Sequence, residues 1–455
     1  MTISSSWHRF RRPLLVAVVG FAPLAATAED ASFKDLQLSA NGFVLRAKSA
    51  EISGSSLSRT TVEAALKNGD PAKLVEQLGK LGATSITFGD FQLERTQGGP
   101  PKTLGFGKLV LTGVSGGKIR ALQGAEGKWQ IGAGQQSQFA SLAASELDAA
   151  FLLRLLGEQA EPADVSQPLV ASAVMERFES RPGGALWLSA QKITLKDMRV
   201  TPQGQSRFGA LGALEISEMR MPLPAGGAPA SKGEVRLRSL IVGADKPTSD
   251  DVPTRYRAKL EDLSVPLPES DPSPTIRNLR GLGLEAIVAS AGLEGTWQPG
   301  KKELTFERLG VAIQNLGTIT LSGRLANVAP DVFTQTGTAA TEQWGQALVE
   351  TMSVVLRNTG LYERAVARTA KNSGRSVDDV KAQVTTVSTQ TIRQMTAGLT
   401  DKTVPDAMIR FFEAPRSLTV SIAPKAGAKL PLSALLARGG MAAMTDKVQI
   451  RAVAE

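Results

Sequence analysis

The feature that most constrains the fold of this chain is a recurring segment in which apolar and polar side chains alternate. Residues 33–38 and 43–48 are the first two such segments, and Asn41-Gly42 lies between them. Alternation with period two places the two kinds of side chain on opposite faces of a β-strand. Asn-Gly is a preferred two-residue hairpin turn. We therefore predict an antiparallel hairpin over residues 31–52.

Later segments repeat this unit. Ile86-Thr87 and Asp90 in residues 85–93 correspond to Ile193-Thr194 and Asp197 in residues 192–200. Each copy runs through a glycine-containing turn into a second alternating segment, which predicts a further hairpin.

A second repeat contains tryptophan. Residues 124–130 (Gly-Ala-Glu-Gly-Lys-Trp-Gln) recur at 292–298 as Gly-Leu-Glu-Gly-Thr-Trp-Gln. We interpret both copies as glycine turns that carry Trp129 and Trp297 onto an apolar face. Core packing is favoured over ligand binding for both indoles, because buried tryptophan is usually a packing residue.

Helical patterns interrupt the strands. Residues 139–156 and 165–178 carry apolar side chains at helical spacing. A longer helical region is predicted over 338–412, with Ser376 as a cap and Asp379 completing a capping box. Within that region, Met352–Leu356 could instead form a strand, since Val354 and Val355 are β-branched.

These patterns predict an α+β fold: an elongated, twisted antiparallel sheet of repeated hairpins, with helical inserts packed on one face. The predicted divisions are a signal peptide (1–28), an N-terminal hairpin region with short helices (29–137), a helical insert (138–184), a second hairpin region (185–333), a helical region (334–413) and C-terminal strands with a short helix (414–455).

The N-terminus resembles a secretory signal. Arg9, Arg11 and Arg12 precede an apolar run from Leu14 to Ala25, and a small-residue site ends at Ala28. We expect cleavage after Ala28 and a periplasmic location in a Gram-negative bacterium. The alternative, an uncleaved anchor, is disfavoured because the run is shorter than the roughly 20 residues of a membrane span.

Composition narrows the chemistry. The chain has no cysteine, and its one histidine is His8, inside the predicted signal. Thiol nucleophiles, imidazole bases and the usual zinc sites are thereby excluded from the exported chain. Gly113–Gly117 fits G-x-S-x-G and Ser189–Lys192 fits S-x-x-K, but both lack the partner residues and helical context of the enzymes concerned. We expect no enzyme, catalytic residue, metal or cofactor.

The chain is basic. Its net charge of +9 becomes +6 on removal of residues 1–28, which contain three arginines and no acid. Simple solubility explains such a charge, and contact with envelope polyanions such as phospholipid headgroups is the alternative. Nucleic acid is not an expected partner, because aromatic side chains are not interleaved with the basic strands. Two predicted strands each carry a basic set on one face, and the five residues are candidate headgroup ligands: Arg236 and Arg238 on the first strand, and Arg255, Arg257 and Lys259 on the second.

The chain resembles repetitive β-rich envelope proteins of the AsmA-like family and uncharacterised periplasmic proteins of Gram-negative bacteria. The resemblance rests on the hairpins at 86–90 and 193–197, on Gly317–Leu325 and on Phe411–Val420. It departs from the AsmA-like pattern in lacking a retained membrane anchor, which puts a direct bridge between membranes in doubt.

An amphipathic sheet must cover its apolar face. Our first hypothesis is that the sheet binds a lipid or an anionic amphiphile there, with peripheral membrane contact. The second is an envelope scaffold that binds another protein along a sheet edge and has no small-molecule ligand. The third, an enzyme using two carboxylates, ranks last.

Overall fold

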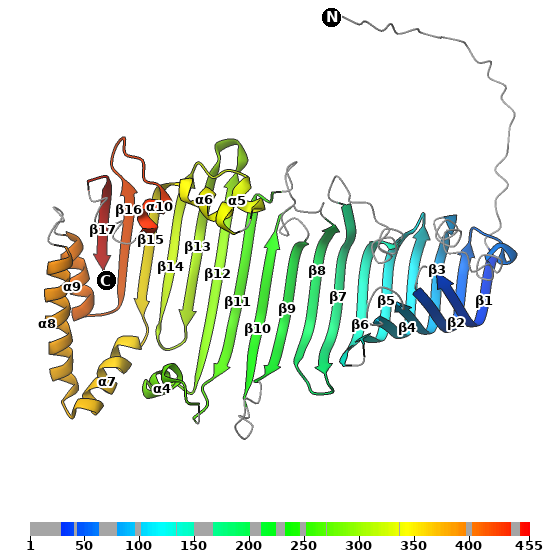
Figure 1. Ribbon diagram of the computed structural model, residues 1–455, viewed down its shortest axis with the longest axis horizontal. Helices are drawn as coiled ribbons and strands as arrows, with labels where there is room; N and C mark the ends of the chain where they lie inside the picture. The colour runs from blue at the N-terminus through cyan, green and yellow to red at the C-terminus, as the bar shows by residue number, and fades with distance from the viewer. Residues whose placement is uncertain are drawn as a thin grey trace, which may run out of the picture.

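The computed structural model describes residues 29–455 except 41–42, 63–79, 96–101, 133, 150–166, 201–210, 224–232, 246–251, 270, 336, 397–402 and 438–445. Within these residues one antiparallel sheet of 17 strands dominates, and it is open, not closed on itself. Figure 1 shows the strands side by side in chain order, from β1 at one edge to β17 at the other.

Every described strand pairs with its neighbours in the sequence, so the sheet is a meander. The strands are β1 (Glu29–Ala40), β2 (Phe43–Ser55), β3 (Ala83–Arg95), β4 (Lys102–Ser115), β5 (Lys118–Ile131), β6 (Gln135–Asp148), β7 (Gln167–Pro182), β8 (Leu188–Val200), β9 (Leu211–Pro222), β10 (Glu234–Ala244), β11 (Arg255–Pro266), β12 (Ala286–Gln298), β13 (Glu303–Ile313), β14 (Gly317–Ala326), β15 (Leu348–Asn358), β16 (Ser417–Pro424) and β17 (Val448–Ala454).

Helices join strands in the C-terminal half. They are α4 (Pro274–Gly281), α5 (Asp331–Thr334), α6 (Thr338–Gln346), α7 (Leu361–Ser373), α8 (Val377–Met395), α9 (Thr403–Glu413) and α10 (Leu432–Leu436), with a short 3-10 turn at Pro299–Lys301. The predicted cap of α8 is confirmed: the Ser376 hydroxyl accepts from the Asp379 backbone N–H at 3.1 Å and donates to its carboxylate at 2.7 Å.

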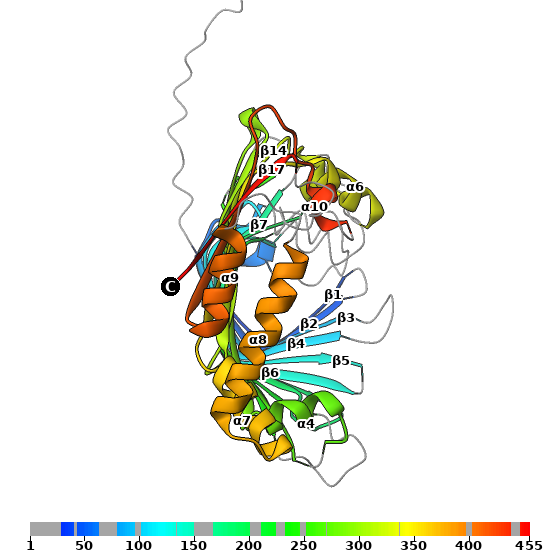
Figure 2. The same cartoon turned by 90° about the vertical axis from the view of Figure 1, so that its left-hand side faces the viewer.

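The sheet is strongly curved. Figure 2, a view along the sheet from its C-terminal edge, shows β1–β6 turning away from the plane of β14 and β17. Two rows of residues with positive φ cross the strands in the N-terminal two-thirds and interrupt their regular pleat.

The first row lies on alternate strands and carries mainly acids. It consists of Asp35, Asp90, Glu126, Arg177, Glu218 and Asp262, on β1, β3, β5, β7, β9 and β11, with φ between 48° and 55°. The second row lies on even-numbered strands and consists of Gly54, Gly113, Glu146 and Asp197. Left-handed residues are uncommon in strands, and asparagine, aspartate and glycine tolerate that conformation best. Aligned kinks of this kind bend the whole sheet along two lines.

The kinks also change the spacing of apolar residues. In β3 the buried or half-buried apolar residues are Ala83, Ile86, Phe88, Phe91 and Leu93, so the intervals alternate between three and two. An interval of three appears where a row crosses a strand, because the residue there leaves the pleat. The register is kept across Asp90 and Glu126, whereas it shifts by one beside Gly54 and Asp262. One face therefore stays apolar although the sequence loses its strict period of two.

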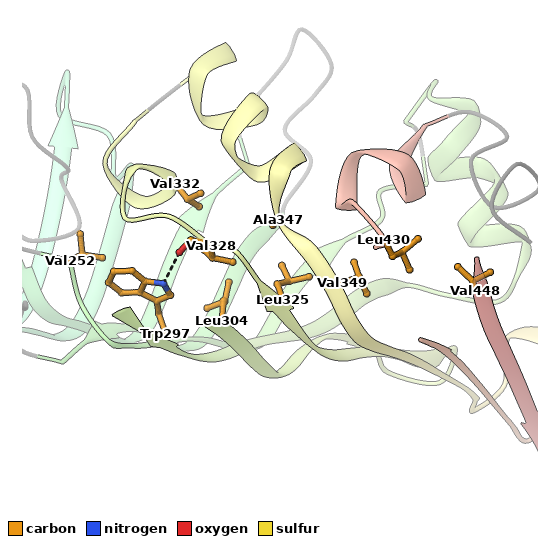
Figure 3. Packing of buried hydrophobic residues seen from close by; sticks show 10 residues of the cluster. All are labelled: Val252, Trp297, Leu304, Leu325, Val328, Val332, Ala347, Val349, Leu430 and Val448. Carbon is orange, nitrogen blue, oxygen red and sulfur yellow. Dashed lines mark hydrogen bonds between the residues drawn. The ribbon is translucent and has the colours of Figure 1, made fainter. Parts of the chain in front are cut away.

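Packing on this apolar face is tightest in two places. Phe91, Phe106 and Phe139 form a row on β3, β4 and β6, with neighbouring ring centroids 5.7–6.2 Å apart. In the C-terminal half, Trp297 is 1% exposed and its indole N–H donates to the Val328 carbonyl at 3.2 Å (Figure 3). Trp297 contacts Phe333, which also stacks on Tyr256.

Several predictions of secondary structure were wrong. The helices predicted at 139–156 and 165–178, and hence the helical insert 138–184, are strand β6 as far as Asp148 and strand β7 over Gln167–Pro182; Ala149 is helical, and residues 150–166 lie outside the described residues. The three-residue apolar spacing of these strands comes from the kinks and imitates a helix turn. The region 334–413 contains β15, as the β-branched alternative predicted. The C-terminal strands and short helix in 414–455 are confirmed.

The glycine–tryptophan repeats were also misread. Both lie inside strands, β5 and β12, and form no turn. Core packing is confirmed for Trp297, whereas Trp129 is 46% exposed. The 31–52 hairpin is confirmed by the pairing of β1 with β2, while its Asn41-Gly42 turn lies outside the described residues.

The two repeats offer a matched test of packing. A Cβ at Gly127 would lie 1.8 Å from the buried Phe139 ring, whereas a Cβ at Gly292 meets nothing within 4 Å. We expect Gly127→Ala to lower the free energy of unfolding by about 1–3 kcal/mol through overpacking. Gly292→Ala should leave it unchanged or raise it slightly, because alanine loses less entropy on folding. Urea unfolding followed by circular dichroism measures both, and equal effects would contradict the packing described.

Candidate functional site

The most extended feature of the apolar face is a pair of apolar ladders. Each contributes one residue from every strand, and each residue lies directly opposite the next across the strand junction. The first ladder is Phe33, Ala50, Phe88, Leu109, Gly124, Leu142, Met175, Ile193, Ile216, Leu240, Leu260, Ala291, Val311, Ile319, Leu356, Leu418 and Ala454.

The second ladder runs beside the first, two residues along each strand for most of the sheet. It is Ala31, Ile52, Ile86, Leu111, Leu122, Ala144, Ala173, Leu195, Leu214, Val242, Ala258, Leu293, Leu309, Leu321, Val354, Val420 and Ala452. We call the two ladders together the apolar band. At about 4.8 Å per junction, the band follows the sheet for roughly 75 Å.

The band is uncovered near its middle. Leu309, Val311 and Ile319 on β13 and β14 are 44%, 48% and 55% exposed, and Val242 and Leu293 on β10 and β12 are also exposed. Leu293, Leu309, Val311 and Ile319 lie on adjoining strands of the two ladders and form one patch, which Ala258 of β11 connects to Val242. A contiguous exposed apolar patch on a folded protein is typical of a binding surface.

Other parts of the chain cover the band and its borders around this patch. Val404 and Ala407 of α9 pack on Leu418 and Ala452, at the C-terminal end of the band. Ile276 and Leu279 of α4 border the strand ends near Ile313. At the N-terminal end, Val62 and Leu81 pack with Ala31, Ile52 and Ile86. The open stretch, from β10 to β14, is therefore bounded on several sides.

A buried hydroxyl lies next to the open stretch. Tyr256 is two residues from Ala258 of the band, and its hydroxyl has no hydrogen-bond partner among the described residues. Burial raises the pKa of Tyr256, and the carboxylate of Asp245 raises it further. The phenol is therefore neutral at physiological pH and is a donor that no described group uses.

The opposite face of the sheet is polar. Arg46 pairs with Glu94 at 2.8 Å, Lys196 with Glu215 at 3.0 Å, and Arg324 with Glu350 at 3.0 Å across neighbouring strands. Gln138 and Arg181 both donate to Glu179, and these hydrogen bonds lower the pKa of its carboxyl. Cross-strand ion pairs of this kind stabilise a solvated sheet face modestly.

The five basic residues predicted as headgroup ligands lie together on this polar face. On β11, Arg255, Arg257 and Lys259 alternate with the residues of the apolar face, and on β10, Arg236 and Arg238 are exposed on either side of the buried Leu237, so all five side chains point away from the apolar face. Acids engage three of them: Arg236 contacts Glu234 at 2.5 Å, Arg238 contacts Asp262 at 3.1 Å, and Lys259 contacts Glu261 at 2.5 Å. The hydrogen bond from Lys259, with the charge of Arg238, lowers the pKa of Glu261.

Arg255 and Arg257 line a shallow depression on the polar face, of about 570 Å³, together with Glu294 and Glu307. Glu307 also borders a second depression, of about 610 Å³, whose other residues include Arg324 and Arg451. Both hollows mix acidic and basic groups. Neither gathers a set of like charges that would select an anionic headgroup.

We next consider a metal site, the two hydrolase-like motifs and a membrane-spanning helix in the described part of the chain. Those residues contain no group of three or more His, Asp or Glu side chains able to hold a metal ion. Gly116 and Gly117, both with positive φ, form the hairpin turn that follows Ser115, and Ser189–Lys192 lies inside β8. No helix within the described ranges is long and apolar enough to cross a membrane.

A family model described as "Uncharacterized protein" matches residues 310–455, from the middle of β13 to the C-terminus. No curated protein matches the chain. The matched part holds α5 to α10 and the last strands of the band.

The sequence analysis expected an apolar face but missed the band. A signal for it is present: apolar residues recur at intervals of two and three, as in Leu104, Phe106, Leu109, Leu111 and Val114 of β4. This spacing differs from that of a regular strand, in which apolar residues recur at intervals of two. It also differs from that of a helix, in which the intervals are three and four.

Tyr256 offers a test of the site's polarity. We expect Tyr256→Phe to leave the free energy of unfolding unchanged or to raise it by about 1 kcal/mol, since it removes a buried hydroxyl without a partner. Thermal unfolding of protein purified without detergent measures the change. A loss of more than about 1 kcal/mol would show that the hydroxyl has a partner.

Proposed function

We propose that the protein is a non-enzymatic binding protein that holds the hydrocarbon part of a lipid or another amphiphile on the open stretch of the apolar band. The observation that carries the proposal is the exposure of Leu309, Val311 and Ile319 in the middle of a continuous apolar surface. Transfer of hydrocarbon from water onto such a surface is favourable by about 0.8 kcal/mol for each buried methylene.

The shape of the band favours an extended chain over a compact ligand. Its side chains follow one another in a line across the strands, and each strand contributes only two of them, so the band is long and narrow. A linear hydrocarbon lying across β10–β14 would contact apolar groups along its whole length. A compact polar metabolite would leave most of the patch in water.

In this proposal the helical inserts share one face of the sheet and act as covers. Helix α9 covers the C-terminal end of the band, and α4, with the segment around α5, α6 and α10, packs on the apolar face beside the open stretch. The bound amphiphile covers the stretch of the band that the helices leave exposed. The resemblance to AsmA-like proteins agrees with this arrangement and remains part of the proposal.

We place the protein in the periplasm of a Gram-negative bacterium, exported by residues 1–28 and cleaved after Ala28. Phospholipids are abundant amphiphiles at both surfaces of that compartment, and the basic polar face would favour peripheral contact with anionic membranes. Because that face lies behind the band, we no longer assign the five basic residues to the headgroup of the bound molecule.

Two valines provide a matched test. Val311 lies on the band and Val453 on the polar face of β17, and their exposed fractions are similar, 48% and 56%. We expect Val311→Glu to reduce the amphiphile retained on the protein by about tenfold or more, because a carboxylate resists burial against hydrocarbon. Val453→Glu should retain the amount found on the unmodified protein.

The measurement is native mass spectrometry of protein purified without detergent, followed by extraction and lipid analysis. Circular dichroism confirms that both variants fold. An unmodified protein at its bare polypeptide mass, with no added lipid bound on incubation with phospholipid vesicles, would overturn the proposal and favour the scaffold hypothesis. Equal loss in both variants would place the binding surface elsewhere.

A further inference from the structure

The sheet ends at β1 without a described partner on its outer side. This strand is 12 residues long and pairs only with β2, and no other described residue makes a backbone hydrogen bond to it. A long open edge strand is a template for another strand. We propose that two copies of this chain pair through β1 about a two-fold axis, which joins their apolar bands into one. We call this β1–β1 contact the joint. Its role in binding an amphiphile rests on the proposed function, whereas its geometry is independent of that function.

The number of strands selects this symmetry. In a meander of 17 antiparallel strands, β1 and β17 run in the same direction. Joining β17 of one copy to β1 of the next would therefore create a parallel pair in an otherwise antiparallel sheet. Two β1 strands related by a two-fold axis are antiparallel, and they keep both apolar faces on the same side. The edge at β17 is also shorter, at seven residues.

The register follows from the position of the band on β1. Ala31 and Phe33 are its two rungs there, so the band is centred on Ser32, which is exposed. A two-fold axis at Ser32 places Ala31 of each copy opposite Phe33 of the other. Both ladders then continue from one copy into the other. Asp35, the residue at the kink of β1, lies opposite Glu29, the first residue of β1 in the second copy.

Charges agree with this register. Lys34 of each copy lies opposite Asp30 of the other; both side chains are exposed, and the Asp30 carboxylate also accepts from the Gly54 backbone N–H of its own copy at 3.0 Å. Opposite charges directly across an antiparallel pair are stabilising. At the ends of the joint Glu29 faces Asp35 of the second copy, and the α-amino group created by cleavage after Ala28 would lie beside these two carboxylates.

The chain has no cysteine, so a single engineered thiol reports the joint. We expect Ser32→Cys to form a disulfide-linked dimer under mild oxidation, because directly opposed residues of an antiparallel pair have Cα atoms about 4.5–5.5 Å apart, within disulfide range. Ser39→Cys, also exposed on β1, is the matched control. Its two copies would be 14 residues apart along the strands, and we expect no cross-link.

A charge exchange tests the register independently. Light scattering of the full exported chain should show a dimer, which Lys34→Glu weakens at least tenfold and Asp30→Lys with Lys34→Glu restores. A monomer at all concentrations would overturn the proposal, as would cross-linking of Ser39→Cys as efficient as that of Ser32→Cys. A monomer that still carries amphiphile would overturn only the joint, and a dimer without amphiphile would overturn only the proposed function.

Discussion

Apolar contact across every strand junction is the interaction on which this structure depends. Each of the two ladders passes through all 17 strands and contains only aliphatic or aromatic residues, methionine and one glycine. Each cross-strand apolar pair contributes about 0.2–1 kcal/mol. With a meander topology, these local pairs hold together an open sheet that has no second sheet behind it among the residues the structure describes. The same contacts create the surface on which we place the ligand.

The kinks make this surface possible. A flat strand with a strict period of two would give straight ladders and a flat sheet, whereas the rows at Asp90 and Glu146 bend neighbouring strands together. The bend brings large side chains close, and glycine must then provide space. Gly124 and Gly127 on β5 admit the rings of Phe106 and Phe139, which are both buried. Curvature and core packing are therefore consequences of the same few positions.

Sequence reasoning predicted several strands even where a kink crosses them, because the stretches beside Asp35, Asp90 and Asp197 still alternate. The first hairpin, residues 85–93 and 192–200, and the C-terminal strands are all found as expected. It failed at β6 and β7, because Phe139, Leu142 and Leu147 have a spacing that periodicity assigns to a helix. The sheet face of the five basic residues was predictable from alternation. The sequence alone did not show that acids engage three of them, or that the band lies on the opposite face. Both facts depend on the register of neighbouring strands.

The central claim is that the open stretch of the band contacts hydrocarbon in the cell. The most direct measurement replaces Val311 with a photo-crosslinking amino acid, irradiates intact cells and identifies the adducts by mass spectrometry, with the same replacement at Val453 as the reference. The account predicts acyl-chain adducts at position 311 and few or none at position 453. Adducts with protein alone at position 311, or equal lipid labelling at both positions, would contradict it.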